Sequence, residues 1–320
     1  MNLHERQRAV LARLDGFAVA DELLAPHTTY KLGGPALVFA TPRTVDELWS
    51  VADALHETEL PVLVIGRGSN LLVSDTGFPG VAVSLAALTE PPADGIRVDD
   101  TTVTAGAAVA LPVLARRTAA AGLTGFEWAV GVPGALGGAV RMNAGGHGSD
   151  MAASLVDATV LDLHRRRCAR VEADRLQLRF RGSDLVDHQV VLDATLRLEH
   201  GDMAAAEAAL AEIVRWRREH QPGGQNAGSV FVNPVPGELA AAQLIDGLGL
   251  RGFRIGGASV SEKHANFVQA EHGATAADVR AVMEHVRVTV FEATGFLLRS
   301  EVRLVGFPDV EPDHREGVAL

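Results

Sequence analysis

Four clusters of glycine constrain the fold of this chain more than any other feature of its sequence. The 320 residues include 33 glycines, and clusters of them occur in 66–68, 131–148, 223–228 and 247–257. Glycine lacks a Cβ, so such clusters mark places where the backbone turns tightly or comes close to another group. The sequence therefore predicts several loops that approach either neighbouring backbone or a ligand.

Length and charge bound the class of protein. A chain of 320 residues is long enough for two domains of about 150 residues each. Its 47% hydrophobic and 22% charged residues are typical of a globular protein. The formal net charge of −11 disfavours a nucleic-acid or membrane-surface partner. It does not exclude an anionic ligand, because glycine loops and single arginines hold phosphates inside acidic proteins.

Cysteine content and apolar runs exclude some kinds of site and indicate where in the cell the protein acts. The single cysteine, Cys168, excludes a disulfide within the chain and a cysteine metal cluster, and we expect no metal site. Cys168 lies in the basic segment 164–170 between two expected strands, which favours a solvated hairpin without a catalytic role. The N-terminus lacks a signal-peptide pattern, and apolar runs such as Pro61–Ile65 are too short to span a bilayer. These features predict a cytoplasmic protein without a membrane partner.

Hydrophobic periodicity predicts mixed helix and strand, with a boundary near residue 200 where strand-rich sequence gives way to helix. The expected helices are 2–14, 44–56, 111–121, 203–220, 239–248 and 276–294. The expected strands are 37–41, 61–65, 81–85, 102–105, 158–163, 190–198, 266–269 and 297–305. We expect the charged tail after Phe307 to fray.

The first glycine loop, 66–75, follows a strand and begins like a dinucleotide-binding fingerprint. It is not one, because Leu71 stands at the third glycine position and the chain continues as strand. Two close glycines let successive N–H groups point at one anion, and Ser69 and Asn70 add side-chain donors. A tight hairpin turn explains the same residues equally well.

The second glycine loop, 131–139, is followed by further glycines in 142–148. This density exceeds what a turn needs and favours close approach to a flat or anionic ligand. The alternative is a loop packed against another backbone.

Three segments, 27–34, 66–75 and 131–148, occur in an order and spacing that resemble the MurB flavoproteins. The match extends in pieces from about Leu23 to Gly306. The resemblance implies an α+β fold with a two-part FAD-binding domain of the vanillyl-alcohol-oxidase type and a C-terminal α+β substrate-binding domain. It places the first domain in 1–200, with lobes of about 1–85 and 86–200, and the second in 201–320.

The resemblance also implies an activity: reduction of UDP-N-acetylglucosamine enolpyruvate to UDP-N-acetylmuramate, through non-covalent FAD and with NADPH. That reaction belongs to peptidoglycan precursor synthesis, and so to cell-wall growth, cell shape and division. We expect a monomer or weak homo-oligomer. The implied cofactor contacts are Tyr30, Gly33, Gly66, Arg67, Gly68, Ser69, Asn70, Leu71, Val130, Gly131, Pro133, Gly134, Gly137, Gly138, Asn143 and Gly145.

Three residues stand in the family's catalytic positions. Arg181 lies in Arg-Phe-Arg-Gly-Ser, Ser229 in Ala-Gly-Ser-Val-Phe-Val-Asn-Pro, and Glu301 in Arg-Ser-Glu-Val-Arg-Leu-Val-Gly. The resemblance implies a cation for the substrate carboxylate, a proton donor and a protonated carboxyl that donates a hydrogen bond. Without it, a surface salt bridge, a turn serine and a solvated strand carboxylate are the ordinary interpretations.

The substrate contacts are expected at Arg217, His220, Asn233 and His264. His220 stands where the family often has lysine, so the nucleotide diphosphate would be held by Arg217, Arg218 or charged His220. The short interval between Ser183 and Ser229 resembles the branch of the family that lacks a substrate-covering tyrosine loop. Two alternatives remain: a related reductase acting on another nucleotide-sugar enol ether, and a flavin-binding protein without catalysis.

Overall fold

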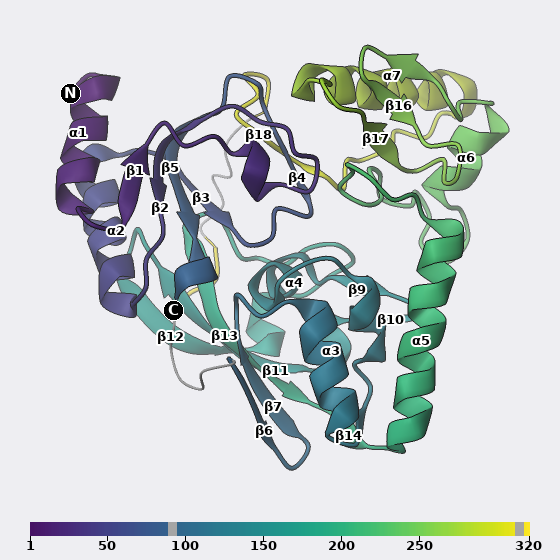
Figure 1. The fold of residues 1–320 in the computed structure, drawn as a ribbon, viewed down its shortest axis with the longest axis horizontal. Coiled ribbons are helices and arrows are strands. Elements are labelled where there is room, and N and C mark those ends of the chain that lie inside the picture. Colours follow the sequence, from purple (N-terminus) through teal and green to yellow (C-terminus); the bar gives the residue numbers. More distant parts are fainter. Residues whose placement is uncertain (89–94, 311–316) are drawn as a thin grey trace.

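A four-stranded sheet with two helices forms the first lobe of the computed structural model, which describes residues 1–88, 95–310 and 317–320 (Figure 1). The strand order is β1-β2-β5-β3, with β2 and β3 both parallel to β5. Thr44 caps the second helix by accepting a hydrogen bond from the Glu47 N–H. The elements are α1 (Leu3–Arg13), β1 (Ala18–Ala20), β2 (Ala36–Ala40), α2 (Val45–Thr58), β3 (Val62–Ile65) and β5 (Phe78–Ser84).

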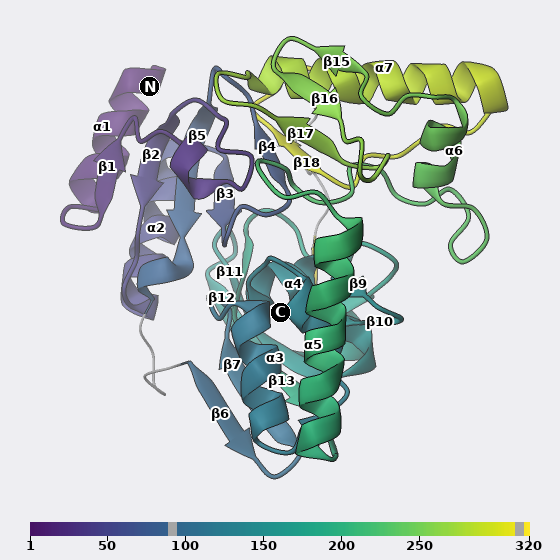
Figure 2. The same ribbon diagram turned by 45° about the vertical axis from the view of Figure 1, so that its right-hand side comes forward.

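The second lobe is a five-stranded antiparallel sheet in the order β12-β11-β13-β7-β6. Its helices are α3 (Leu111–Ala120), α4 (Leu136–Met142) and α5 (Met203–His220). Its strands are β6 (Ile96–Asp99), β7 (Thr102–Gly106), β11 (Leu155–Asp162), β12 (Arg167–Glu172) and β13 (Gln189–Arg197). Figure 2 shows α5 running alongside α3 and leading to the C-terminal part. The buried face of α5 belongs to the core that the two lobes share, and the division expected near residue 200 stays a prediction.

The C-terminal part is a small antiparallel sheet covered by a long helix. Its elements are α6 (Ala241–Gly247), β15 (Arg254–Ile255), β16 (Ala258–Val260), β17 (Val268–Ala270) and α7 (Ala276–Thr294). Helix α7 begins at a capping box between Thr275 and Asp278 and ends at Gly295, which has φ of +76°. The chain then returns to the first glycine loop, because β18 (Arg303–Val305) pairs in parallel with β4 (Leu71–Val73).

Short elements complete the fold. They are η1 (Ala25–His27), η2 (Leu85–Ala87), β8 (Leu123–Thr124), η3 (Glu127–Gly131), β9 (Gly145–Gly146), β10 (Ser149–Asp150), η4 (Met151–Ala153), η5 (Ala173–Leu176) and β14 (Glu199–His200). Within the described residues, no helix combines the length and apolar character needed to cross a bilayer. In the same residues no group of three or more His, Cys, Asp or Glu side chains is placed to hold a metal ion.

Each of the six expected helices is present, and the structure corrects several other expectations. The segment 131–139, expected as a loop, contains most of α4, whose apolar positions Leu136, Ala139 and Val140 are buried. The strand expected over 297–305 is confined to β18, because only this part has β4 as a partner. The fraying expected after Phe307 is wrong for residues 317–320, where Val318 is buried; residues 311–316 lie outside the described chain.

Cys168 lies on strand β12 rather than in the turn of the hairpin. It pairs with Leu161 of β11 and its side chain is exposed. Although the residue is exposed, the thiol loses part of its hydration on the sheet; this loss, reinforced by Asp193, raises the pKa of the thiol, so the neighbouring arginines do not activate it.

Candidate functional site

Two adjoining cavities, of about 610 and 520 Å³, lie where the two lobes and the C-terminal part meet. The first reaches the segment 26–31 and strand β13, and the second reaches 227–229 and Glu301. The residues that line both are Val64, Gly66, Arg67, Pro133, Ala135, Gly138 and Arg141. An extended ligand can therefore occupy both cavities along the two glycine loops.

The first glycine loop joins β3 to β4 and lines the second cavity from Gly66 to Leu71. Gly68 has φ of +60°, and a Cβ there would come within 2.0 Å of the His27 carbonyl oxygen. The loop is thus packed against neighbouring backbone and also faces the cavity. Among the described residues, none accepts a hydrogen bond from the backbone N–H groups of 67–70. These donors fit an anionic ligand.

The second glycine loop leaves room for a flat group at Gly138. A Cβ built there would have no protein atom within 4 Å, although Gly138 lines both cavities. At Gly137 glycine is needed for packing within the protein, because a Cβ built there would lie 2.8 Å from the Ala107 Cβ. The space at Gly138 and the N–H groups of the first loop together fit a cofactor with a planar ring and a diphosphate.

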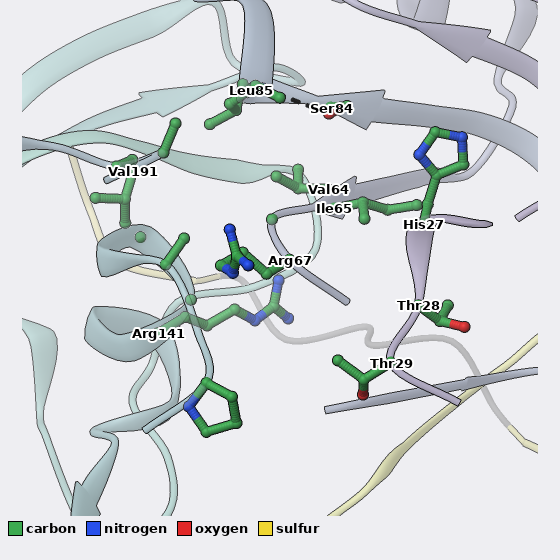
Figure 3. A pocket seen from close by; sticks show the side chains of 18 of the residues that line it. His27, Thr28, Thr29, Val64, Ile65, Arg67, Ser84, Leu85, Arg141 and Val191 are labelled. Carbon is green, nitrogen blue, oxygen red and sulfur yellow. Dashed lines mark hydrogen bonds between the residues drawn. The ribbon is translucent and has the colours of Figure 1, made fainter. Parts of the chain in front are cut away.

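The cavities are positively charged inside an acidic protein. The first is lined by Lys31, Arg67 and Arg141, and Figure 3 shows the two arginines close together, across the cavity from Thr28 and Thr29. The second adds arginines at 181, 217 and 303, with Glu301 the one carboxylate among the described lining residues. Such a lining favours ligands with several negative charges.

Arg181 and Glu301 form an ion pair in the second cavity, with 2.8 Å between Nε and Oε1. Arg181 Nη1 also donates to the Gly145 carbonyl at 3.0 Å. Arg181 has φ of +58°, an uncommon conformation for a non-glycine residue and one that often accompanies a functional role. Its Nε–H is buried and not aligned for a hydrogen bond with any described residue, so the contact with Glu301 is mainly electrostatic.

Glu301 has an environment that raises the pKa of its carboxyl group. The side chain is 18% exposed, and burial raises its pKa against the opposing attraction of Arg181 and Arg299. Its backbone N–H donates to the Val230 carbonyl at 2.8 Å, and its carbonyl accepts from Asn70 Nδ2 at 3.0 Å. The carboxyl group is thereby fixed relative to the first glycine loop.

Ser229 is positioned by a buried amide that sequence reasoning did not assign. Asn266 Nδ2 donates to the Phe231 carbonyl at 2.8 Å, and Asn266 Oδ1 accepts from the Phe231 N–H at 3.0 Å. The Val230 N–H donates to the Asn266 carbonyl at 2.9 Å, and Ser229 bridges to Phe267. Two strand-like segments thus hold Ser229 at the wall of the second cavity.

Most of the residues predicted from the sequence line these cavities. The three catalytic candidates and Arg217 line the second cavity. The cofactor candidates that line one or both are Gly66, Arg67, Gly68, Ser69, Asn70, Leu71, Gly131, Pro133, Gly134, Gly137, Gly138 and Gly145.

Four cofactor candidates lie outside both linings. Tyr30 is fully buried, its hydroxyl donates to the Val268 carbonyl at 3.0 Å, and burial raises its pKa. Gly33 has φ of +127°, and a Cβ built there would lie 2.7 Å from the Val73 Cβ. Val130 is buried in the core. The Asn143 amide binds Asp150 and two backbone groups. Packing and hydrogen bonding within the protein account for each of them.

Three substrate candidates also lie outside the linings. His220 stacks on Trp216, with ring centroids 4.6 Å apart, and its Nδ1 lies 2.8 Å from the Trp216 carbonyl. Asn233 accepts from the Ala241 N–H at the start of α6. His264 packs against Phe267, and burial lowers its pKa, which favours a neutral, structural histidine.

Further residues of the linings were not predicted from the sequence. Arg141 reaches both cavities from α4, and its place beside the second glycine loop was the available signal. Trp216 and Gln221 line the second cavity, and Gln221 Oε1 is buried without a hydrogen-bond partner among the described residues. These two side chains offer an apolar surface and a polar atom to a ligand.

Two family models and the curated relatives match this chain. Residues 36–164 match a family model described as FAD binding domain, and residues 220–305 match UDP-N-acetylenolpyruvoylglucosamine reductase, C-terminal domain. The chain is 43% identical over 287 residues to the UDP-N-acetylenolpyruvoylglucosamine reductase of Heliobacterium modesticaldum, covering 89% of this chain and 90% of that one. For the Bacillus subtilis reductase the identity is 38% over 294 residues, covering 91% and 95%.

A solved structure agrees. The crystal structure of the reductase (MurB) from Thermus caldophilus aligns with a TM-score of 0.75 and 33% identity, covering 90% of this chain and 98% of that one. The α+β fold with an FAD-binding domain is therefore confirmed. The chain belongs to the UDP-N-acetylenolpyruvoylglucosamine reductase (MurB) family of FAD-dependent oxidoreductases.

Proposed function

We propose that this protein reduces UDP-N-acetylglucosamine enolpyruvate to UDP-N-acetylmuramate with NADPH. The observation that carries the proposal is the Arg181–Glu301 pair, which lines the same cavity as Ser229 and the glycine loops. A protein that only bound FAD would need none of these three side chains at the cavity wall. Their joint presence favours catalysis over simple flavin binding.

The glycine loops are the proposed cofactor site. The N–H groups of 67–70 and the guanidinium of Arg67 suit the diphosphate, and the space over Gly138 suits the ring. When bound, FAD supplies the hydride, which it takes in turn from NADPH.

Arg181 is the proposed anchor for the substrate carboxylate. A guanidinium matches a carboxylate through parallel N–H donors. Hydride addition to the terminal methylene carbon leaves negative charge on the neighbouring carbon and its carboxylate. Arg181 stabilises that charge directly, and its hydrogen bond to Gly145 fixes it before substrate arrives.

Glu301 is the proposed hydrogen-bond donor to the developing charge, and Ser229 is the proposed proton donor to carbon. Burial raises the pKa of the Glu301 carboxyl, and in its protonated form this group donates a hydrogen bond to the developing charge. The Ser229 hydroxyl then transfers its proton to the carbon next to the carboxylate. Serine is a weak acid, and the positive lining of the cavity stabilises the oxyanion that remains.

Arg217 is the proposed contact for the nucleotide diphosphate. It lines the second cavity, whereas His220 is turned onto Trp216. The same proposal places this reaction in the cytoplasm, in peptidoglycan precursor synthesis, which supports cell shape and division. It also includes a monomer or weak homo-oligomer as the state of the protein. So does a division into a cofactor-binding part, 1–200, and a substrate-binding part, 201–320.

The test is product formation from UDP-N-acetylglucosamine enolpyruvate and NADPH, followed by NADPH absorbance and by mass spectrometry of the sugar nucleotide. We expect stoichiometric NADPH oxidation and a product heavier by two hydrogens. Ser229→Ala should slow turnover by about a hundredfold or more, whereas Ser50→Ala on the exposed face of α2 should not. A protein that binds FAD but leaves this substrate unchanged would redirect the assignment to another nucleotide-sugar enol ether.

A further inference from the structure

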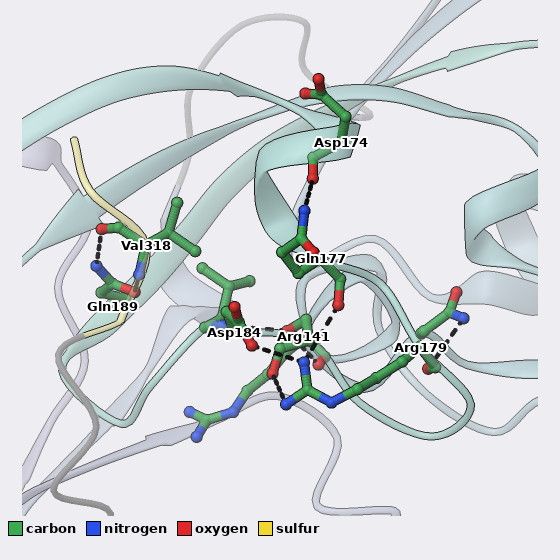
Figure 4. Close-up of polar contacts among 10 residues, drawn as sticks. Arg141, Asp174, Gln177, Arg179, Asp184, Gln189 and Val318 are labelled. Atoms are coloured by element: carbon green, nitrogen blue, oxygen red, sulfur yellow. Dashed lines mark hydrogen bonds and ion pairs between the residues drawn. The ribbon is translucent and has the colours of Figure 1, made fainter.

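The last four residues of the chain, 317–320, are docked on the second lobe. Val318 is 4% exposed and belongs to the core that the two lobes share. Its N–H donates to Gln189 Oε1 at 3.0 Å, and its carbonyl accepts from Gln189 Nε2 at 2.7 Å (Figure 4). This reciprocal pairing satisfies both polar groups of a buried amide side chain.

Two arginine hydrogen bonds and close packing at Gly317 also stabilise the docked tail. Arg175 Nη2 donates to the Ala319 carbonyl at 2.6 Å, and Arg167 Nη1 donates to the Leu320 backbone oxygen at 3.2 Å. Gly317 has φ of +75°, and a Cβ there would lie 2.5 Å from Gln189 Oε1 and 2.7 Å from Val186 Cγ2. The position therefore requires glycine for both conformation and space.

The tail contacts the turn 186–189, which also binds Arg141, a residue that lines both cavities. Gln189, at the start of β13, lines the first cavity. Three residues earlier, the Val186 carbonyl accepts from Arg141 Nη1 at 3.1 Å. Asp187 Oδ1 lies 2.5 Å from Arg141 Nη2. One short turn, 186–189, thus joins the docked tail to the guanidinium of Arg141.

We propose that residues 317–320 form a positioning element for the cofactor. They fix the turn 186–189, and through it Arg141, whose guanidinium lies near that of Arg67 and, with it, binds the diphosphate of FAD where the two cavities adjoin. The inference rests on the cofactor site of the proposed function. A guanidinium already held in place loses little freedom on binding an anion, so its contribution to affinity depends on the turn that holds it.

The test is the dissociation constant of FAD, measured by quenching of flavin fluorescence on flavin-free protein. Gly317→Ala forces the added methyl against Gln189 and Val186. Gly273→Ala is the matched control, because Gly273 has φ of +87° and no atom within 4 Å of its Cβ. Both substitutions strain the backbone, but only the first disturbs the turn. We expect Gly317→Ala to weaken FAD binding by about tenfold and Gly273→Ala to leave it within about twofold of wild type.

A truncation after Glu316 and a double-mutant cycle with Arg141→Lys test the route. If the tail acts through Arg141, truncation weakens FAD binding by about tenfold in the wild type but by less than about twofold when Lys stands at 141. Equal losses in both backgrounds would refute the route, because a merely structural tail gives additive effects. Unchanged affinity in both Gly317→Ala and the truncation would overturn the proposal. Since only FAD binding is measured, failure of turnover with the enolpyruvate substrate leaves this test intact.

Discussion

Gly138→Ala should move protein stability and cofactor affinity in opposite directions. Gly138 lies inside helix α4, where alanine is favoured over glycine by about 0.5–1 kcal/mol. The added methyl meets no protein atom within 4 Å, so nothing in the protein opposes that gain. The same methyl enters the space assigned to the cofactor. Overpacking of a closely fitted contact costs about 1–3 kcal/mol, which corresponds to about a five- to 150-fold loss of FAD affinity.

Two measurements separate these effects. Thermal unfolding of the flavin-free variant should show a midpoint about 1–3 °C above wild type for a gain of this size. Fluorescence titration should show the weaker binding of FAD. Gly137→Ala serves as the contrast, because its methyl would lie 2.8 Å from the Ala107 Cβ and should destabilise the flavin-free protein. Wild-type FAD affinity in Gly138→Ala would refute the placement of the cofactor along α4.

Three side chains near the cavities carry further expected outcomes. Burial raises the pKa of Glu301, so the wild type loses stability as pH rises from about 4.5 through that raised pKa. Glu301→Gln should remove this loss, which urea unfolding between about pH 4 and 8 would measure. Parallel curves of unfolding free energy against pH for the two proteins would contradict the prediction. Tyr30→Phe should cost about 1–3 kcal/mol by leaving the Val268 carbonyl unpaired, with unchanged FAD affinity in titration. Arg217→Ala should raise the KM for the sugar nucleotide more than His220→Ala does, and the reverse order would refute the diphosphate assignment.

The sequence predicted the elements whose signals are local. Helices α2 and α7 begin at cap residues Thr44 and Thr275 and bury the faces that their apolar spacing indicates. The catalytic candidates were found because each lies in a specific motif. The structure brings all three to one cavity, although Arg181 and Glu301 are 120 residues apart along the chain (301 − 181).

The missed features depend on contacts between distant segments. Glycine lowers helix propensity, so the residues of α4 read as a loop, and packing against β13 and β7 overrides that preference. The docked tail depends on the Gln189 amide, 129 residues before Val318. Tyr30 matches the family pattern, but its hydrogen bond to Val268, 238 residues away, cannot be read from local spacing.

The central claim is that Ser229 protonates the substrate after hydride transfer, at a site whose cofactor is FAD. Anaerobic stopped-flow absorbance tests it by following loss of the flavin band with NADPH and then its return on addition of UDP-N-acetylglucosamine enolpyruvate. We predict that Ser229→Ala leaves the NADPH step near the wild-type rate and slows the return by about a hundredfold or more, the scale of a lost general acid. Equal slowing of both steps, or a wild-type protein whose flavin band does not return with this substrate, would contradict the account.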